Sequence, residues 1–113
     1  MQNLQEFPDF IRALPQIELP FKGARGWLMQ GQKMQTVFME FDRETSIPEH
    51  THAEQWEFPL AGKVRVKSER GDAEYMPGEN FSIPADEPHS ATVSGGYRAL
   101  IIFNSPDRYR PKK

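Results

Sequence analysis

The sequence predicts a small all-β fold, an antiparallel barrel or jelly roll preceded by a short helical turn. Two observations carry this prediction. Short segments of alternating apolar and polar residues recur at near-regular spacing, each bounded by Gly or Pro, and no long segment has the apolar period of a helix. The 113 residues suffice for one domain. We expect residues 1–32 to pack on a barrel formed by residues 33–104, with residues 105–113 as a solvated tail.

Near the N-terminus, apolar residues recur at helical spacing: Leu4, Phe7, Phe10, Ile11 and Leu14. This pattern predicts one or two helical turns over residues 8–13. The helix should end before Pro15, because a residue that precedes proline avoids the α region. So short a helix is not stable alone, and we therefore expect it to lie on the barrel.

Residues 16–21 alternate, which predicts a strand. Pro20 would restrict that strand to the edge of a sheet, because proline has no N–H to donate. Gly23 and Gly26 predict a turn before the apolar residues 27–29.

The clearest strand is predicted over residues 33–42, where Val37, Met39 and Phe41 share one face. Five further short strands are expected at residues 63–67, 73–76, 80–83, 89–93 and 98–103. The turn-forming residues 68–72 indicate a hairpin loop, as does the pair Gly95-Gly96.

All three histidines lie in two segments that are marked by glycine and proline. His50 and His52 would point the same way from an extended backbone, because the side chains of a strand alternate between its faces. Gln55 and Glu57 follow with oxygen donors, and His89 lies in the second segment. Three imidazoles and one oxygen suit a divalent transition metal (Zn, Ni, Fe, Mn, Co or Cu) far better than Ca or Mg.

The two segments resemble the two motifs of the cupin family. In the first, a His-x-His pair precedes Gln55, which is followed by six residues and Gly62. In the second, Gly78 is followed by five residues and Pro84, and a histidine comes five positions later. The resemblance runs from about Gln35 to Arg108 and implies a cupin barrel that assembles as a homodimer. It implies four metal ligands: His50, His52, Gln55 and His89.

The fourth ligand is open to two assignments. Counting back from Gly62 puts Gln55 at the family's ligand position, whereas counting forward from His52 over four residues reaches Glu57. We favour Gln55, because Gly62 closes a turn that fixes the strand before it, while length can vary just after the histidines. The chain also departs from the family pattern at Pro59, within the strand, and at Asp86, where glycine is usual.

Composition excludes several classes of function. Fourteen basic and sixteen acidic residues give a net charge of −2, so no overall field attracts nucleic acid or an anionic membrane. The absence of cysteine excludes disulfides and thiolate ligands. No apolar run approaches the roughly 20 residues of a membrane span, and residues 1–6 lack the features of a signal peptide. We expect a cytoplasmic protein.

The expected function is binding of a small oxygen-rich molecule to the metal, with Glu57 and Tyr97 as candidate acid/base groups. Trp56 and Phe58 should lie on the opposite face of their strand and serve in packing, within the subunit or between subunits. The closing run Asp107-Arg108-Tyr109 resembles that of small one-domain bacterial cupins.

Small cupins that resemble this chain at Gln55 include a uronate ring-opening enzyme of polysaccharide breakdown. That resemblance implies a sugar-acid isomerase or lyase as the first reaction class, with a dioxygenase second. A non-catalytic binding or sensor module is the alternative from another class, and a metal-free barrel is a third.

Overall fold

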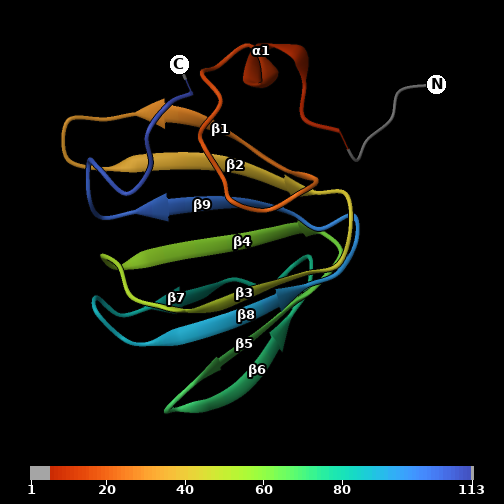
Figure 1. Ribbon diagram of the computed structural model, residues 1–113, viewed down its shortest axis with the longest axis vertical. Coiled ribbons are helices and arrows are strands. Elements are labelled where there is room, and N and C mark those ends of the chain that lie inside the picture. The colour runs from red at the N-terminus through yellow and green to blue at the C-terminus, as the bar shows by residue number, and fades with distance from the viewer. Residues whose placement is uncertain (1–5, 113) are drawn as a thin grey trace.

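The computed structural model describes residues 6–112, so Leu4 of the predicted helical pattern lies outside the described residues. Within them the chain forms one short helix and two facing β-sheets (Figure 1). The elements are α1 (Asp9–Arg12), β1 (Ala24–Gln30), β2 (Gln35–Phe41), β3 (Thr45–His50), β4 (Gln55–Ala61), β5 (Val64–Ser68), β6 (Gly71–Tyr75), β7 (Phe81–Ile83), β8 (His89–Val93) and β9 (Arg98–Phe103).

All strand pairings are antiparallel. One sheet has the order β1-β2-β9-β4-β7 and the other the order β3-β8-β5-β6. Because strands distant in sequence lie side by side, such as β2 beside β9, the sheets form a jelly roll rather than a simple meander. The predicted all-β barrel is therefore confirmed.

The core lies between the sheets. Val37, Met39 and Phe41 point inward from β2, as the alternation predicted, and are almost completely buried. They pack with inward residues of the other strands: Val64, Phe81, Ile83, Val93, Ala99, Ile101 and Phe103. Burial of this apolar surface supplies the main favourable free energy of the fold.

The helical turn α1 covers part of the outer face of the five-stranded sheet, near β1 and β2 (Figure 1). Phe7 makes edge-on contacts with Trp27 and Phe38, at ring-centroid distances of 6.0 and 5.7 Å. Ile11 is buried in the same cluster. These contacts explain why so short a helix is stable here.

Two expectations for the segment before β2 are wrong. Residues 16–21 do not form a strand, and only Gln16 and Ile17 make isolated bridges, because Pro15 and Pro20 flank them with residues that cannot donate. Gly26 is not in a turn but within β1, where its missing side chain makes room for Ile17. A Cβ at that position would lie 2.8 Å from Ile17 Cδ1.

The segment after β9 is not the solvated tail that was expected. Lys112 N–H donates to the Gln16 carbonyl at 2.7 Å, and Glu18 N–H donates to the Arg110 carbonyl at 3.1 Å. Tyr109 is mostly buried and packs against the core. These long-range partners order the segment against the open end of the barrel.

No helix among residues 6–112 has the length and apolar character needed to cross a lipid bilayer.

Candidate metal centre

The two predicted histidine segments meet at one end of the barrel. His50, the last residue of β3, lies directly opposite His89, the first residue of β8. We expected His52 to lie on the same strand as His50. It lies instead in the loop between β3 and β4. This loop is fixed by backbone bonds: Asp86 N–H donates to the His52 carbonyl at 2.9 Å, and Asn104 N–H donates to the Glu54 carbonyl at 2.8 Å.

Asp86 connects the second motif to the first. Its φ of 62° lies in the left-handed region, which explains why glycine is usual at this position of the family and why a short polar side chain can replace it. The backbone turn is therefore kept, and with it the bond to His52.

The three imidazoles share one hydrogen-bonding arrangement. In each, Nδ1 lies against a backbone carbonyl: His50 with Pro48 at 2.9 Å, His52 with Ala53 at 2.6 Å, and His89 with Glu87 at 2.9 Å. A carbonyl can only accept, so Nδ1 must carry the proton, and the neutral ring then has an unprotonated Nε2. Such a carbonyl partner is the usual outer support of a metal-ligating histidine.

The unprotonated nitrogens converge, and this tests whether the site fits a metal. Nε2 of His52 and Nε2 of His89 are 3.1 Å apart, and ligand atoms of His50, His52 and His89 all lie within 4.8 Å of one another. Two lone pairs at that distance repel unless a cation lies between them. Two nitrogens bound at about 2.1 Å to one ion, at angles between 90 and 109°, are about 3.0–3.4 Å apart, so the spacing fits.

A proton bound between the two Nε2 atoms could also relieve this repulsion, but the pKa values do not favour it. The pKa of His52 is lowered to about 4, mainly by burial and also by the charge of Arg108, against the opposing effect of the bond to Ala53. Burial likewise lowers the pKa of His50. Near neutral pH His50 and His52 are therefore neutral ligands, which supports a divalent metal at this cluster.

Gln55 and Glu57 both point into the barrel from β4, because they share a parity and the strand's irregularity lies further on, between Pro59 and Ala61. Gln55 Nε2 donates to Glu57 Oε1 at 2.7 Å, and the Tyr97 hydroxyl donates to Glu57 Oε2 at 2.5 Å. Among residues 6–112 no hydrogen bond engages Gln55 Oε1. Glu57 thus orients the amide so that its oxygen is available as a ligand.

Glu57 has the ionisation expected of an acid/base group. Burial raises its pKa to about 7, although the bonds from Tyr97 and Gln55 favour the charged form. Burial and the neighbouring Glu57 also raise the pKa of Tyr97, so the phenol remains protonated. Glu57 can accept or release a proton near neutral pH.

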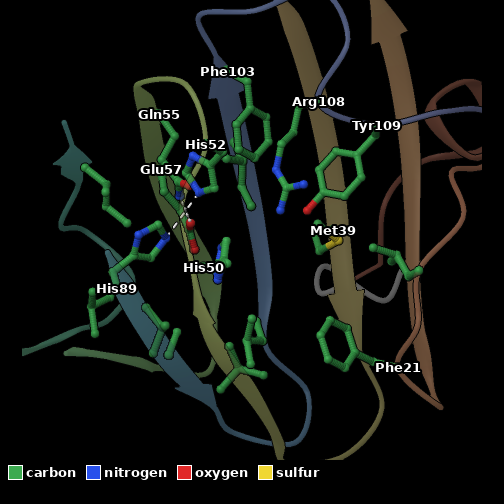
Figure 2. Close-up of a pocket in the computed structure, with 18 of the residues that line it drawn as sticks. Phe21, Met39, His50, His52, Gln55, Glu57, His89, Phe103, Arg108 and Tyr109 are labelled. Carbon is green, nitrogen blue, oxygen red and sulfur yellow. Dashed lines mark hydrogen bonds between the residues drawn. The ribbon is translucent and has the colours of Figure 1, made fainter. Parts of the chain in front are cut away.

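Sequence reasoning did not assign a site role to Arg108 and Tyr109, which line the same cavity as the histidines. Figure 2 shows the Arg108 guanidinium pointing into the space between Tyr109 and the histidines. Its carbon lies 4.6 Å from the Tyr109 ring centroid, and its Nε is buried without a hydrogen-bond partner. Within residues 6–112 no carboxylate pairs with this arginine.

The cavity has a volume of about 480 Å³, within the range of roughly 300–1,000 Å³ typical of small-molecule sites. It holds the histidine cluster, Gln55 and Glu57 on one side and Arg108 on the other.

No protein-family model and no curated protein sequence matches the chain. Solved structures do. A cupin superfamily protein from Desulfitobacterium hafniense DCB-2 is 18% identical with a TM-score of 0.68, over 79% of this chain and 84% of that one. KdgF from Halomonas sp. is 22% identical with a TM-score of 0.70, over 81% of this chain and 88% of that one.

Oxalate decarboxylase from Bacillus subtilis, in a study of its Mn(II) centres, is 20% identical with a TM-score of 0.68 over 80% of this chain. This chain spans only 27% of that larger protein. The shared topology of these structures establishes that the chain has the cupin fold.

Proposed function

We propose that this chain is a metal-dependent cupin enzyme whose substrate is a small carboxylic acid, held between the histidine cluster and Arg108. One observation carries the metal part of the proposal: the unprotonated Nε2 atoms of His52 and His89 lie 3.1 Å apart, and a ring nitrogen of His50 lies within 4.8 Å of the other ligand atoms. The other carries the substrate part: a guanidinium without a carboxylate partner faces these nitrogens across the cavity.

The ligands would be His50, His52, His89 and the amide oxygen of Gln55. This set suits Zn, Ni, Fe, Mn, Co or Cu, and the Mn(II) centres named for oxalate decarboxylase lend support to manganese as one member. Because an amide is neutral, four such ligands leave the full charge of the ion in place. When bound, the ion would supply Lewis acidity toward a carbonyl or carboxylate oxygen.

The residues of the chain would divide the remaining work. Arg108 would bind and orient the substrate carboxylate, because a planar guanidinium matches a carboxylate geometrically and Tyr109 holds it by stacking. Glu57 would take and return a proton, since its pKa of about 7 suits both directions. Tyr97 would keep Glu57 in position and share its proton.

These roles fit an isomerase or lyase, in which a proton leaves one carbon and is returned to the substrate or product. The sugar-acid enzymes implied by the sequence resemblance belong to this class. A dioxygenase is less well supported, because the ligand set lacks the carboxylate of the common iron triad.

We also propose that the chain forms a homodimer through the outer face of its five-stranded sheet, as the cupin resemblance implies. Trp56 lies opposite Ile102, and Phe58 lies opposite Leu100, so their side chains share that face. Trp56 and Leu60 are 46% and 51% exposed. Of the described N-terminal residues, Phe7 and Ile11 cover the part of the face formed by β1 and β2, and Trp56, Phe58 and Leu60 present an apolar surface of the kind that homodimers bury.

The function is tested by elemental analysis of freshly purified protein, followed by assays of the metal-loaded protein with uronates and 2-oxo acids. We expect about one transition-metal ion per chain and turnover of at least one acid. A protein that takes up no metal would contradict the proposal. Metal and acid binding without turnover of any acid would favour the binding module instead.

A further inference from the structure

The cavity is polar around the histidines and Arg108, and much of the rest of its inner wall is apolar. On the inner face of the four-stranded sheet, His50 and His89 form one cross-strand row. The next inward row consists of Ile47, Ala91 and Val66, paired across β3, β8 and β5. All three line the cavity and are only partly buried.

The opposite wall continues this apolar surface. Met39 contributes from β2, and Leu19 and Phe21 contribute from the segment before β1. Figure 2 shows Met39 and Phe21 below Arg108 and Tyr109, on the side of the cavity away from Gln55. A ligand that is anchored at Arg108 and is longer than its carboxylate group would therefore extend along aliphatic and aromatic side chains.

Away from the metal position and Arg108, the inner wall offers few polar groups to substrate hydroxyls, because the other charged lining residues, Glu18, Glu49, Asp107 and Arg110, are exposed at the surface. Glu57 accepts one hydrogen bond at each carboxylate oxygen, from Gln55 and from Tyr97, and the acceptor capacity that it keeps serves the proposed proton transfer. The imidazoles are directed at the metal position, and Arg108 is matched to a carboxylate. A polyhydroxylated ligand would bury several hydroxyls against carbon, and each unpaired hydroxyl weakens binding by about tenfold or more.

We propose that the substrate is a carboxylic acid with an apolar body, aliphatic or aromatic, rather than a polyhydroxylated sugar acid. This inference rests on the proposed function, and specifies which carboxylic acids the site selects. The carboxylate lies between Arg108 and the metal position, and the apolar body lies between the Ile47-Ala91-Val66 row and Met39 and Phe21.

Calorimetric titration of the Ni²⁺-loaded protein with a graded series of acids tests the inference. The series is pyruvate, 2-oxobutanoate, 4-methyl-2-oxopentanoate and 3-phenylpyruvate, with galacturonate as the polyhydroxylated member. We expect affinity to rise by about fourfold for each buried methylene, and 3-phenylpyruvate to bind at least tenfold more tightly than galacturonate. A flat series, or galacturonate binding as tightly as 3-phenylpyruvate, would overturn the inference while leaving the proposed function intact.

Two variants locate the apolar body. Ala91→Leu fills the middle of the row and should weaken 3-phenylpyruvate binding at least tenfold while changing pyruvate less than threefold. Val66→Thr keeps the shape of the wall and should weaken 3-phenylpyruvate selectively through its hydroxyl. Thr92→Leu, on the exposed face of the same β8 strand, is the matched control. Equal effects of Ala91→Leu and Val66→Thr on both acids would overturn the placement, and binding of no acid at all would overturn the proposed function and this inference together.

Discussion

The side-chain amide of Gln35 pairs with both backbone polar groups of Tyr109. Tyr109 N–H donates to Gln35 Oε1 at 3.0 Å, and Gln35 Nε2 donates to the Tyr109 carbonyl at 3.0 Å. Gln35 Nε2 also donates to Gln30 Oε1 at 2.9 Å, while Gln30 Nε2 donates to the Pro106 carbonyl at 2.9 Å. Two amides thus replace a strand partner for the segment that carries Arg108.

Replacing Gln35 should release this segment without unfolding the barrel. In Gln35→Leu, the backbone of Tyr109 loses two partners, and we expect about 1–3 kcal/mol lower stability. Hydrogen exchange over residues 105–112 should become faster, and carboxylate affinity should fall as Arg108 loses its position. Metal content should not change. Gln32→Leu, at an exposed position nearby, is the control, and unchanged exchange over residues 105–112 in Gln35→Leu would contradict this role.

Metal affinity should depend more on Gln55 than on Glu57. Gln55→Ala removes a direct oxygen ligand and should weaken affinity by roughly 10-fold or more, whereas Glu57→Ala removes only the group that orients Gln55 and should have a smaller effect. Competition with a chromophoric chelator measures both. If Glu57→Ala has the larger effect, the fourth ligand is a carboxylate, and a dioxygenase becomes the better-supported reaction class.

The stability of the chelator-treated protein should respond to pH through two opposed groups. The pKa of Glu57 is raised from 4.5 to about 7 in the folded protein. Glu57 therefore loses its proton at a lower pH in the unfolded chain than in the folded protein, and it lowers the free energy of unfolding as pH rises from about 4.5 to about 7. The pKa of His52 is lowered from 6.5 to about 4, so His52 lowers stability as pH falls from about 6.5 to about 4.

Glu57→Gln separates the two contributions, because glutamine keeps the shape and cannot ionise. Between pH 4.5 and 7, denaturant titrations should show the variant gaining stability over the wild type, by up to about 3 kcal/mol. Its remaining pH dependence should include the loss on the acid side to which His52 and His50, both with lowered pKa values, contribute. A difference between the two proteins that does not vary with pH would mean that Glu57 has an ordinary pKa in the folded protein.

The sequence was sufficient for local features and insufficient for distant ones. Alternation predicted the inward face of β2, and motif spacing predicted that His89 would join His50 and His52. The position of His52 in a loop could not be predicted, because it depends on Asp86 and Asn104 reaching the loop from other segments. The role of Arg108 was missed for the same reason: Gln35 and Tyr109 are 74 positions apart, and the resemblance of the run 107–109 to other small cupins did not indicate that this segment returns to the cavity.

The proposed dimer depends on the apolar face around Trp56. Trp56→Lys introduces a charge at its centre and should convert a dimer into a monomer of 13.1 kDa, because a buried unpaired charge opposes association. Sedimentation velocity measures the mass. Met76→Lys changes an apolar side chain of similar exposure, 49%, on a different part of the surface, and should leave the assembly unchanged. A wild-type protein that sediments as a monomer would remove the proposal.

Arg108 should recognise the charge of the substrate and not its body. Arg108→Gln keeps much of the side-chain stem but removes the cation, so we expect binding of 4-methyl-2-oxopentanoate to weaken by about 10- to 100-fold, the range expected when a hydrogen bond to a charged group is lost.

The neutral amide of the same acid separates charge recognition from packing. Its weak binding should change little in Arg108→Gln, because only the acid has lost a cationic partner. Arg65→Gln, which alters an exposed arginine on β5, should affect neither compound, and the Ni²⁺ content of all three proteins should be equal. Equal weakening of the acid and the amide in Arg108→Gln would mean that this residue acts only as a wall of the cavity, where it stacks on Tyr109 and lies 5.8 Å from the Phe103 ring.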